Sequence, residues 1–219
     1  MWCIGQITQE YRERMYELLA LYRRPLNPEE PVVCLDEKSK QLLADSRDPL
    51  PMQPGRPCRA DYEYRRAGTC NIFLAVEPRG GRREVQVTPR RGKVDFVAFV
   101  TKLITGVYAR AKTVHLVLDN LNTHFRACFE DILGERLTAR LLRRVEFHYT
   151  PKHASWLNLA ELEIGIMERQ CSGGRVADSL FLEAQIKAWQ RRRNRAKSMI
   201  DWKFTRRDAD RKLAHHYVP

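Results

Sequence analysis

The chain has 219 residues, of which 43% are hydrophobic and 30% charged, and its net charge is +12. This composition indicates one substantial globular domain and excludes a disordered chain. The sequence has no run of about 18 uncharged apolar residues and no signal-peptide core, which excludes a membrane-spanning or secreted protein. Six cysteines without any C-x-x-C pair predict reduced thiols rather than disulfides or a structural zinc site.

The positive charge is concentrated in two segments. Residues 79–93 contain six basic residues and one acidic residue, and residues 187–212 contain eleven basic and three acidic residues. Arginine outnumbers lysine by 29 to 10, and its planar guanidinium binds phosphate through two parallel hydrogen bonds. These segments favour a nucleic-acid partner over a merely solvated basic face. The candidate DNA-binding residues in them are Arg82, Arg83, Arg90, Arg91, Arg191, Arg192, Arg193 and Arg195.

The chain begins with a predicted helix and a predicted strand. Apolar residues recur at helical spacing over 6–22, and the pattern ends before Pro25. Residues 31–36 indicate a short buried strand that ends in Asp36. Four prolines and a glycine between 44 and 68 predict a long loop, and loops of that length inside a domain are usually functional.

The middle of the chain alternates between strand and helix patterns. Strands are expected over 69–76 and 83–87, joined as a hairpin. Asp95 is expected to cap a helix whose apolar residues recur at spacings of three and four. Residues 113–118 form a nearly continuous apolar strand before Asp119. Because this strand follows a crossover helix, we expect it to be parallel and central in the sheet.

The remaining elements complete an α/β pattern. They are short helices near 123–131 and 135–142, a strand over 145–149, and helices over 155–170 and 178–194. Strands that are interrupted by helices in this order predict a layered α/β fold with a mixed sheet.

Three acidic residues occupy unusual positions. Asp36 and Asp119 end two buried strands, where either one alone could equally be a loop cap. At 100° per residue, Glu161 lies on an apolar helix face with Gly165, and the small glycine leaves room beside its carboxylate. Glu163 points about 200° away from Glu161 and is expected to face solvent.

Converging carboxylates repel one another unless a cation lies between them. Mg²⁺ takes oxygen ligands, and two such ions about 4 Å apart stabilise both reacting oxygens of a phosphoryl displacement. We therefore expect Asp36, Asp119 and Glu161 to be catalytic residues that hold a two-ion Mg²⁺ site, with Mn²⁺ as a substitute. Together with the basic segments, they indicate a nuclease or a strand transferase.

Three motifs resemble the DDE-superfamily transposases of bacterial insertion sequences, of the "six-thirty" type related to mariner elements. They span residues 32–38, 114–124 and 149–161, and Ser-Trp-Leu-Asn followed by Glu161 is the most specific part. The resemblance covers almost the whole chain. It implies a ribonuclease-H-like fold with a mixed five-stranded sheet flanked by helices. The three acids would lie on the first strand, after the fourth strand and on the helix after the fifth.

The resemblance also implies a function and a domain organisation. Residues 1–30 would be a helical lead-in, 31–172 the catalytic domain and 173–219 a basic helical extension. The domain would cleave double-stranded DNA at element ends and transfer the freed 3′ hydroxyl to target DNA, in the bacterial cytoplasm at the nucleoid. The helix-turn-helix domain usual in such transposases is not expected in this chain, so a separate helix-turn-helix polypeptide and a second copy of the chain are expected partners. The alternative is a catalytically silent remnant that binds DNA or regulates transposition.

The residues around the acids leave alternatives open. Lys152 and His153 are expected either to contact DNA phosphate or to make loop hydrogen bonds. Asn120, Asn122 and His124 either assist the metal site or cap the following helix. Trp156 is interpreted as a packing anchor rather than a stacking platform for a base.

Overall fold

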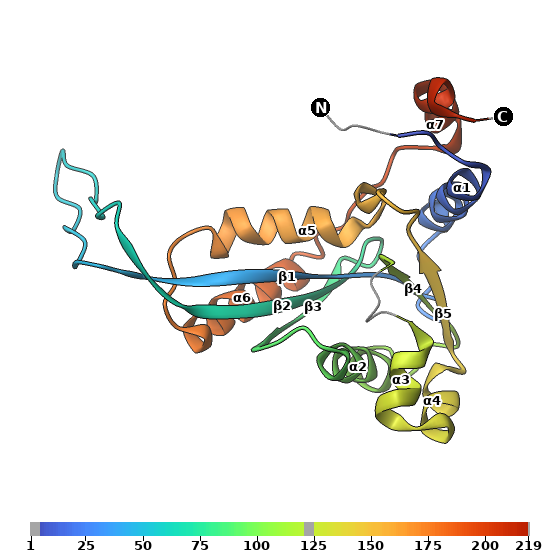
Figure 1. The fold of residues 1–219 in the computed structure, drawn as a ribbon, viewed down its shortest axis with the longest axis horizontal. Helices are drawn as coiled ribbons and strands as arrows, with labels where there is room; N and C mark the ends of the chain where they lie inside the picture. Colours follow the sequence, from blue (N-terminus) through green and yellow to red (C-terminus); the bar gives the residue numbers. More distant parts are fainter. Residues whose placement is uncertain (1–4, 121–124, 219) are drawn as a thin grey trace.

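Among residues 5–120 and 125–218, which the computed structural model describes, five strands form one mixed sheet in the order β3-β2-β1-β4-β5 (Figure 1). The strands are β1 (Val32–Asp45), β2 (Tyr64–Glu77), β3 (Arg82–Thr88), β4 (Val114–Leu118) and β5 (Val145–Tyr149). β2 pairs antiparallel with both β1 and β3, whereas β4 pairs parallel with both β1 and β5. The expected mixed five-stranded sheet is confirmed, as is the parallel pairing of β4, although β4 is second from the edge and β1 is the central strand.

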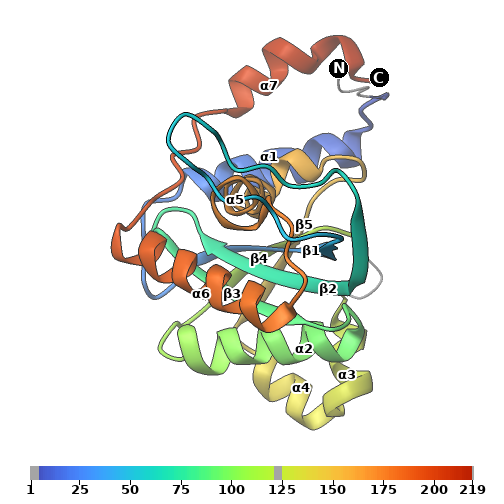
Figure 2. The same cartoon turned by 90° about the vertical axis from the view of Figure 1, so that its left-hand side faces the viewer.

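Helices cover both faces of the sheet. They are α1 (Gln9–Arg23), α2 (Lys93–Lys102), α3 (Arg126–Leu133), α4 (Glu135–Leu142), α5 (Leu159–Met167), α6 (Ser179–Arg195) and α7 (Arg206–Leu213). Helices α1, α5, α6 and α7 contribute to one core cluster, and α2, α3 and α4 contribute to the other. Figure 2 shows α1 and α5 on one side of the strands and α2, α3 and α4 on the opposite side.

Alternation along the strands divides the core into these two clusters. On β1, Cys34 belongs to the cluster with α5, whereas Val33 and Leu35 belong to the cluster with α2. On β4, Val117 faces α5 and Leu116 faces α2 in the same way. Because successive side chains of a strand point to opposite faces, every second residue after Cys34 or Val117 is also directed to the α5 face.

The region 44–68 is not a plain loop. β1 and β2 are each 14 residues long, and they extend well beyond the rest of the sheet as an arm (Figure 1). Within its tip, residues 46–63, the isolated bridges Leu50–Arg59 and Gln53–Arg56 continue the pairing. The prediction that a strand ends at Asp36 was wrong, because cross-strand pairing with β2 extends β1 to Asp45 and local residue patterns do not reveal it.

The two ends of the described chain lie together. Ile7 N–H donates to the His216 carbonyl at 2.8 Å, and Val218 N–H donates to the Ile7 carbonyl at 3.1 Å. Helices α1 and α7 contact each other beside this pairing, and α7 lies above α1 in Figure 1. Within the described residues, no helix combines the length and the apolar character needed to cross a bilayer. No disulfide joins the cysteines of the same residues.

Candidate active site

The register of the sheet places Asp36 level with Asp119. The parallel pairing of β1 with β4 ends at Cys34 opposite Val117, and two further residues along each strand lead to the two aspartates. Cys34 and Val117 both face α5, so the aspartates are directed to that face as well. β4 ends at Leu118, whereas β1 continues to Asp45. Asp36 therefore lies on β1 at the level where the neighbouring strand β4 ends.

Asn158 attaches helix α5 to the strand that carries Asp36. Its side chain is buried, its Nδ2 donates to the Leu35 carbonyl at 2.9 Å, and its Oδ1 accepts from Ala160 N–H at 3.1 Å. Asn158 is thus the N-cap of α5, the position that asparagine prefers. Glu161 lies in the first turn of α5, and this cap holds it beside β1. An asparagine directly before an apolar helix was the sequence signal for this role.

Asp119 and Glu161 act electrostatically on Asp36. The pKa of Asp36 is raised from 3.8 to about 7, mainly by burial and also by the negative charges of Asp119, Glu37 and Glu161. A hydrogen bond from Glu37 N–H to Asp36 Oδ1, at 2.8 Å, opposes the rise. Glu168, on the same helical face as Glu161, is instead paired with Lys38 at 2.7 Å. Asp119 and Glu161 therefore lie near enough to Asp36 to raise its pKa, while the catalytic role of the three acids stays a prediction.

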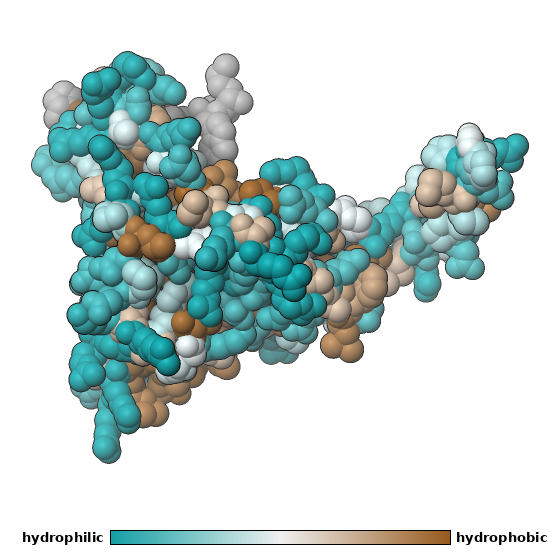
Figure 3. Space-filling model, turned by 180° about the vertical axis from the view of Figure 1, so that it is seen from behind, coloured by the Kyte–Doolittle hydropathy of each residue, from teal (hydrophilic) through white to brown (hydrophobic). Residues whose placement is uncertain are grey.

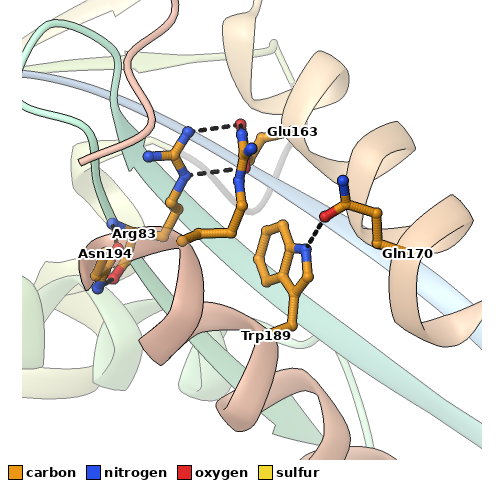
Figure 4. Close-up of polar contacts among 6 residues, drawn as sticks. Arg83, Glu163, Gln170, Trp189 and Asn194 are labelled. Atoms are coloured by element: carbon orange, nitrogen blue, oxygen red, sulfur yellow. Dashed lines mark hydrogen bonds and ion pairs between the residues drawn. The ribbon is translucent and has the colours of Figure 1, made fainter. Parts of the chain in front are cut away.

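Glu163 is fully buried, and the prediction that it faces solvent was wrong. Its two carboxylate oxygens accept hydrogen bonds from Arg83 Nε and Nη2, both at 2.9 Å (Figure 4). Arg193 Nε and Nη2 donate to the same oxygens at 2.9 and 3.1 Å. Helix periodicity could not show this burial, because it results from tertiary packing: β3 and α6 cover the side of α5 that is opposite Glu161.

This buried ion pair also corrects the assignment of DNA-binding residues. Arg83 is 0% exposed and lies inside the protein, so its predicted role in DNA binding was wrong. Arg193 donates to Glu163 through two nitrogens and its side chain is 18% exposed, so its guanidinium is not available to phosphate either. These two arginines hold α5 between β3 and α6 instead.

Side chains of α6 also complete the hydrogen bonds of the edge strand β3. Asn194 accepts from Arg83 N–H at 2.7 Å and donates to the Arg83 carbonyl at 2.9 Å. Gln190 accepts from Val85 N–H at 3.1 Å, and Trp189 is anchored through a hydrogen bond to Gln170 (Figure 4). An exposed edge strand is a template for unwanted pairing, and α6 removes that hazard here.

The other candidate DNA-binding residues are exposed. Arg82 lies over the ring of Tyr108, with 5.9 Å between its guanidinium carbon and the ring centroid. The exposed arginines elsewhere are Arg90 and Arg91 in the turn before α2, and Arg191, Arg192 and Arg195 on α6.

Lys152 and His153 are exposed in the connection between β5 and α5. They line a groove together with Arg14 and Asn120, so this groove lies at the end of β4 that leads to Asp119. Asn120 Nδ2 donates to the Thr150 carbonyl and so joins the ends of β4 and β5. Asn122 and His124 lie outside the described residues.

Trp156 packs within an aromatic group. Its ring centroid lies 6.4 Å from that of Trp202 in a stacked arrangement and 5.6 Å from that of Phe204, edge to face. This packing agrees with the interpretation of Trp156 as an anchor, here between the start of α5 and the segment before α7.

Residues 31–180 match the sequence profile of the DDE superfamily endonucleases, which is well over half of the chain. The chain belongs to this family. The resemblance of the three motifs to DDE-superfamily proteins is therefore confirmed. No match was found among the curated proteins.

Solved structures of the Mos1 mariner transposase are similar to this fold. The Mos1 paired-end complex with Mg aligns with a TM-score of 0.59 at 14% identity, over 100% of this chain and 66% of that chain. A pre-cleavage Mos1 transpososome aligns with a TM-score of 0.58 at 15% identity, over 94% of this chain and 61% of that chain. This likeness confirms the ribonuclease-H-like fold. The chain thus spans less than two thirds of the length of these Mos1 chains.

Breaking the buried ion pair should strongly destabilise the protein. Arg83→Met leaves the charge of Glu163 buried with only Arg193 as partner, so we expect the free energy of unfolding to fall by about 3–5 kcal/mol in urea titrations. Combining Arg83→Met with Glu163→Leu should recover part of the loss, because no fully buried charge is then left and the side chain of Arg193, which is 18% exposed, has access to solvent.

The matched control is Lys93→Met, which breaks an ion pair with Asp131 whose side chains are 49% and 54% exposed. It should change the unfolding free energy by less than about 1 kcal/mol. Equal losses in Arg83→Met and Lys93→Met would show that the buried pair does not hold α5.

The raised pKa of Asp36 predicts a pH dependence of stability in the metal-free protein. The folded state holds the Asp36 proton up to about pH 7, whereas the unfolded chain releases it near pH 4. The contribution of Asp36 to the free energy of unfolding therefore decreases as the pH rises from 4 to 7. The free energy of unfolding of Asp36→Asn, measured by urea titration and taken relative to that of wild type, should thus increase by about 1–4 kcal/mol from pH 4 to pH 8. A constant difference across that range would contradict the buried, protonated state of Asp36.

Proposed function

We propose that this chain is the catalytic part of a transposase, which cleaves double-stranded DNA at element ends and transfers the 3′ hydroxyl to target DNA. Asp36, Asp119 and Glu161 are its catalytic residues in this proposal. The observation that carries it is the convergence of two strand-borne aspartates and one helix-borne glutamate on the α5 face of the sheet. Membership of the DDE superfamily endonucleases supports the same chemistry.

The three acids fit a site for divalent cations. Asp36 is a buried carboxyl group whose pKa is raised to about 7, partly by its acidic neighbours, and a cation would relieve that repulsion. An all-oxygen donor set suits Mg²⁺, with Mn²⁺ as a substitute. Asp36 and Asp119 would hold one ion, and Glu161 would share in holding a second. Two bound ions would supply charge stabilisation to the attacking and leaving oxygens at phosphorus. The Mos1 paired-end complexes are described with Mg and with Mn.

The residues around the acids set their positions. Asn158 holds the start of α5 against β1, which keeps Glu161 beside Asp36. Glu163 holds the opposite side of the same helix through Arg83 and Arg193. The helix is thereby fixed on two sides, which limits the freedom of the one acid that does not lie on or directly after a strand of the sheet.

Double-stranded DNA is the proposed partner. Lys152 and His153 lie in the groove beside Asn120, where they would contact phosphate near the acids. Arg82, Arg90 and Arg91, together with the α6 arginines Arg191, Arg192 and Arg195, would add contacts that do not depend on sequence. The protein would then work in the bacterial cytoplasm at the nucleoid.

A second copy of the chain is the other proposed partner. The arm tip exposes Leu50 at 66%, Met52 at 76% and Tyr62 at 86%, and Figure 3 shows the arm projecting with apolar patches along it. Apolar side chains on a projecting arm gain burial only against another molecule.

In the proposed organisation, residues 31–172 form the catalytic domain, and the segments 1–30 and 173–219 pack on it. Core residues of α1, α6 and α7 share one cluster with β1, which supports this view.

The proposed chemistry predicts metal-dependent nicking of DNA. Wild-type protein should nick supercoiled plasmid with Mg²⁺ or Mn²⁺, while Ca²⁺ should support binding without cleavage because its coordination is looser. Asp119→Asn is nearly isosteric but removes a ligand charge, so nicking should fall at least about a hundredfold, as for loss of a catalytic ligand. Gel electrophoresis of the plasmid over time measures the rate.

The control for this assay is Asp131→Asn, which neutralises an exposed aspartate paired with Lys93. It should nick at the wild-type rate. Nicking that persists equally in Asp119→Asn would show that the activity lies elsewhere. Absence of nicking by wild-type protein under all three metals would favour the silent DNA-binding remnant.

Neutralising the exposed α6 arginines should weaken DNA binding and its salt dependence. Replacement of Arg191, Arg192 and Arg195 by Gln should flatten the slope of log affinity against log salt by about 0.9 for each of these arginines that binds a phosphate. The matched control replaces Arg136, Arg140 and Arg143 by Gln, because these arginines are exposed at α4 on the other face of the sheet. Equal slopes in the two triple variants, measured by fluorescence anisotropy, would mean that α6 does not contact DNA.

A further inference from the structure

Two histidines and a glutamate converge on β4 and β5, away from the three acids. In the parallel register, His115 of β4 is opposite Glu146 of β5, and His148 follows Glu146 by two residues on the same face. His115 Nδ1 lies 3.1 Å from Glu146 Oε2 and 3.1 Å from His148 Nε2. Asp119 is four residues further along from His115, which is about 13 Å of extended chain. We call His115, Glu146 and His148 the histidine cluster.

The distances within the histidine cluster suit a metal ion. Ligands about 2.0–2.1 Å from a tetrahedral ion lie about 3.3 Å from one another, close to the 3.1 Å separations found here. The potential ligand atoms of its three side chains all lie within 4.8 Å of one another, and among the described residues no other group of three His, Cys, Asp or Glu side chains meets that criterion. Two imidazole nitrogens and one carboxylate form a donor set of the kind that binds Zn²⁺.

A second carboxylate orients one of the two rings. His148 Nδ1 lies 2.5 Å from Glu17 Oε1 of α1, so Nδ1 carries the proton and donates to that carboxylate. The lone pair of His148 Nε2 is then directed toward His115 and Glu146. Histidine ligands of metals almost always donate their other ring nitrogen to a carboxylate, a carbonyl or water in this way. Glu17 is therefore placed to hold His148 in the tautomer that a metal requires.

Arg24 opposes metal binding at the other ring. Its Nη1 lies 3.0 Å from His115 Nε2 and donates to it, so in the metal-free state His115 carries its proton on Nδ1. Metal binding at Nδ1 requires that proton to move to Nε2 and Arg24 to turn away. Arg24 is an exposed residue at the C-cap of α1, so its side chain has solvent to turn into. The side chains of His115 and His148 are only 5% and 12% exposed, whereas Glu146 is 60% exposed and gives an ion access.

We propose that the histidine cluster binds one divalent transition-metal ion of the zinc type through His115 Nδ1, His148 Nε2 and Glu146. The fourth position of a tetrahedral ion would be taken by water. The ion would join the edge strand β5 to β4 and, through Glu17, hold α1 against the sheet. Arg24 would lower the affinity of the site until it turns away.

Cobalt(II) is the probe for this site, because tetrahedral Co²⁺ absorbs strongly in the visible range whereas the hydrated ion does not. The full chain, freed of metal by a chelator, should bind one Co²⁺ that gives the visible spectrum of a tetrahedral ion, and Zn²⁺ should displace that ion. His148→Gln and Glu146→Gln should each weaken binding at least a hundredfold. Glu17→Gln should weaken it about 10–100-fold, as expected for a partner of a metal ligand.

Arg24→Met supplies a test in the opposite direction. Removing the competing guanidinium should tighten Co²⁺ binding about tenfold or more, whereas a hydrogen-bond network without a metal function would show no gain. His153→Gln, at an exposed histidine elsewhere, and Asp119→Asn, at the proposed catalytic site, should both retain the wild-type spectrum. Circular dichroism checks that each variant is folded.

Two results would overturn the proposal. One is an unchanged Co²⁺ affinity in folded His148→Gln and Glu146→Gln. The other is the absence of a tetrahedral Co²⁺ spectrum in both wild type and Arg24→Met at millimolar Co²⁺. If the cluster variants do not fold, the opposite shifts expected for Glu17→Gln and Arg24→Met decide the question. Neither outcome depends on nicking of DNA, so the proposed nuclease activity is tested separately.

Discussion

The parallel pairing of β1 with β4 is the constraint on which the candidate active site depends. It spans only three residue pairs, but it fixes which residues of the two strands are level. Because side chains alternate between faces, the same register also decides that Asp36 and Asp119 are directed to the face that α5 covers. A shift by one residue would turn either aspartate into the cluster with α2. The chemistry proposed for the chain therefore rests on backbone hydrogen bonds at the centre of the sheet.

Helix α5 carries two acidic residues with opposite tasks. Glu161 lies toward the aspartates, and its negative charge adds to the rise in the pKa of Asp36 that burial mainly causes. Glu163 lies on the other side and is compensated by two arginines. In the proposed function Glu161 shares an external cation, whereas Glu163 is neutralised from within the protein. The second arrangement supports the first, because it fixes the orientation of the helix.

The arginines of the chain fall into two groups, those that pair with other side chains within the protein and those that are exposed to solvent. Arg83 and Arg193 neutralise Glu163 inside the protein, and Arg24 donates to His115 at the histidine cluster. These arginines are structural, although they add to the net charge of +12. Arginines that remain exposed, such as those on the outer face of α6, are the ones that phosphate can reach. Net charge alone therefore did not reveal which arginines are free to contact the proposed DNA partner.

Periodicity and motif spacing alone determined the mixed sheet, the parallel pairing of β4, and the placing of two acids after apolar strand segments and one on a helix. These features are local, since they follow from the alternation of apolar residues within one element and from an acid placed beside it. Only the tertiary structure decided that β1 continues past Asp36, that Glu163 and Arg83 are buried together, and that Glu17 meets His148. Each of these features depends on contacts between residues far apart in the chain, whereas a local residue pattern carries information only about the segment in which it lies. Tertiary packing decides which element buries a side chain and which partner residue that element supplies.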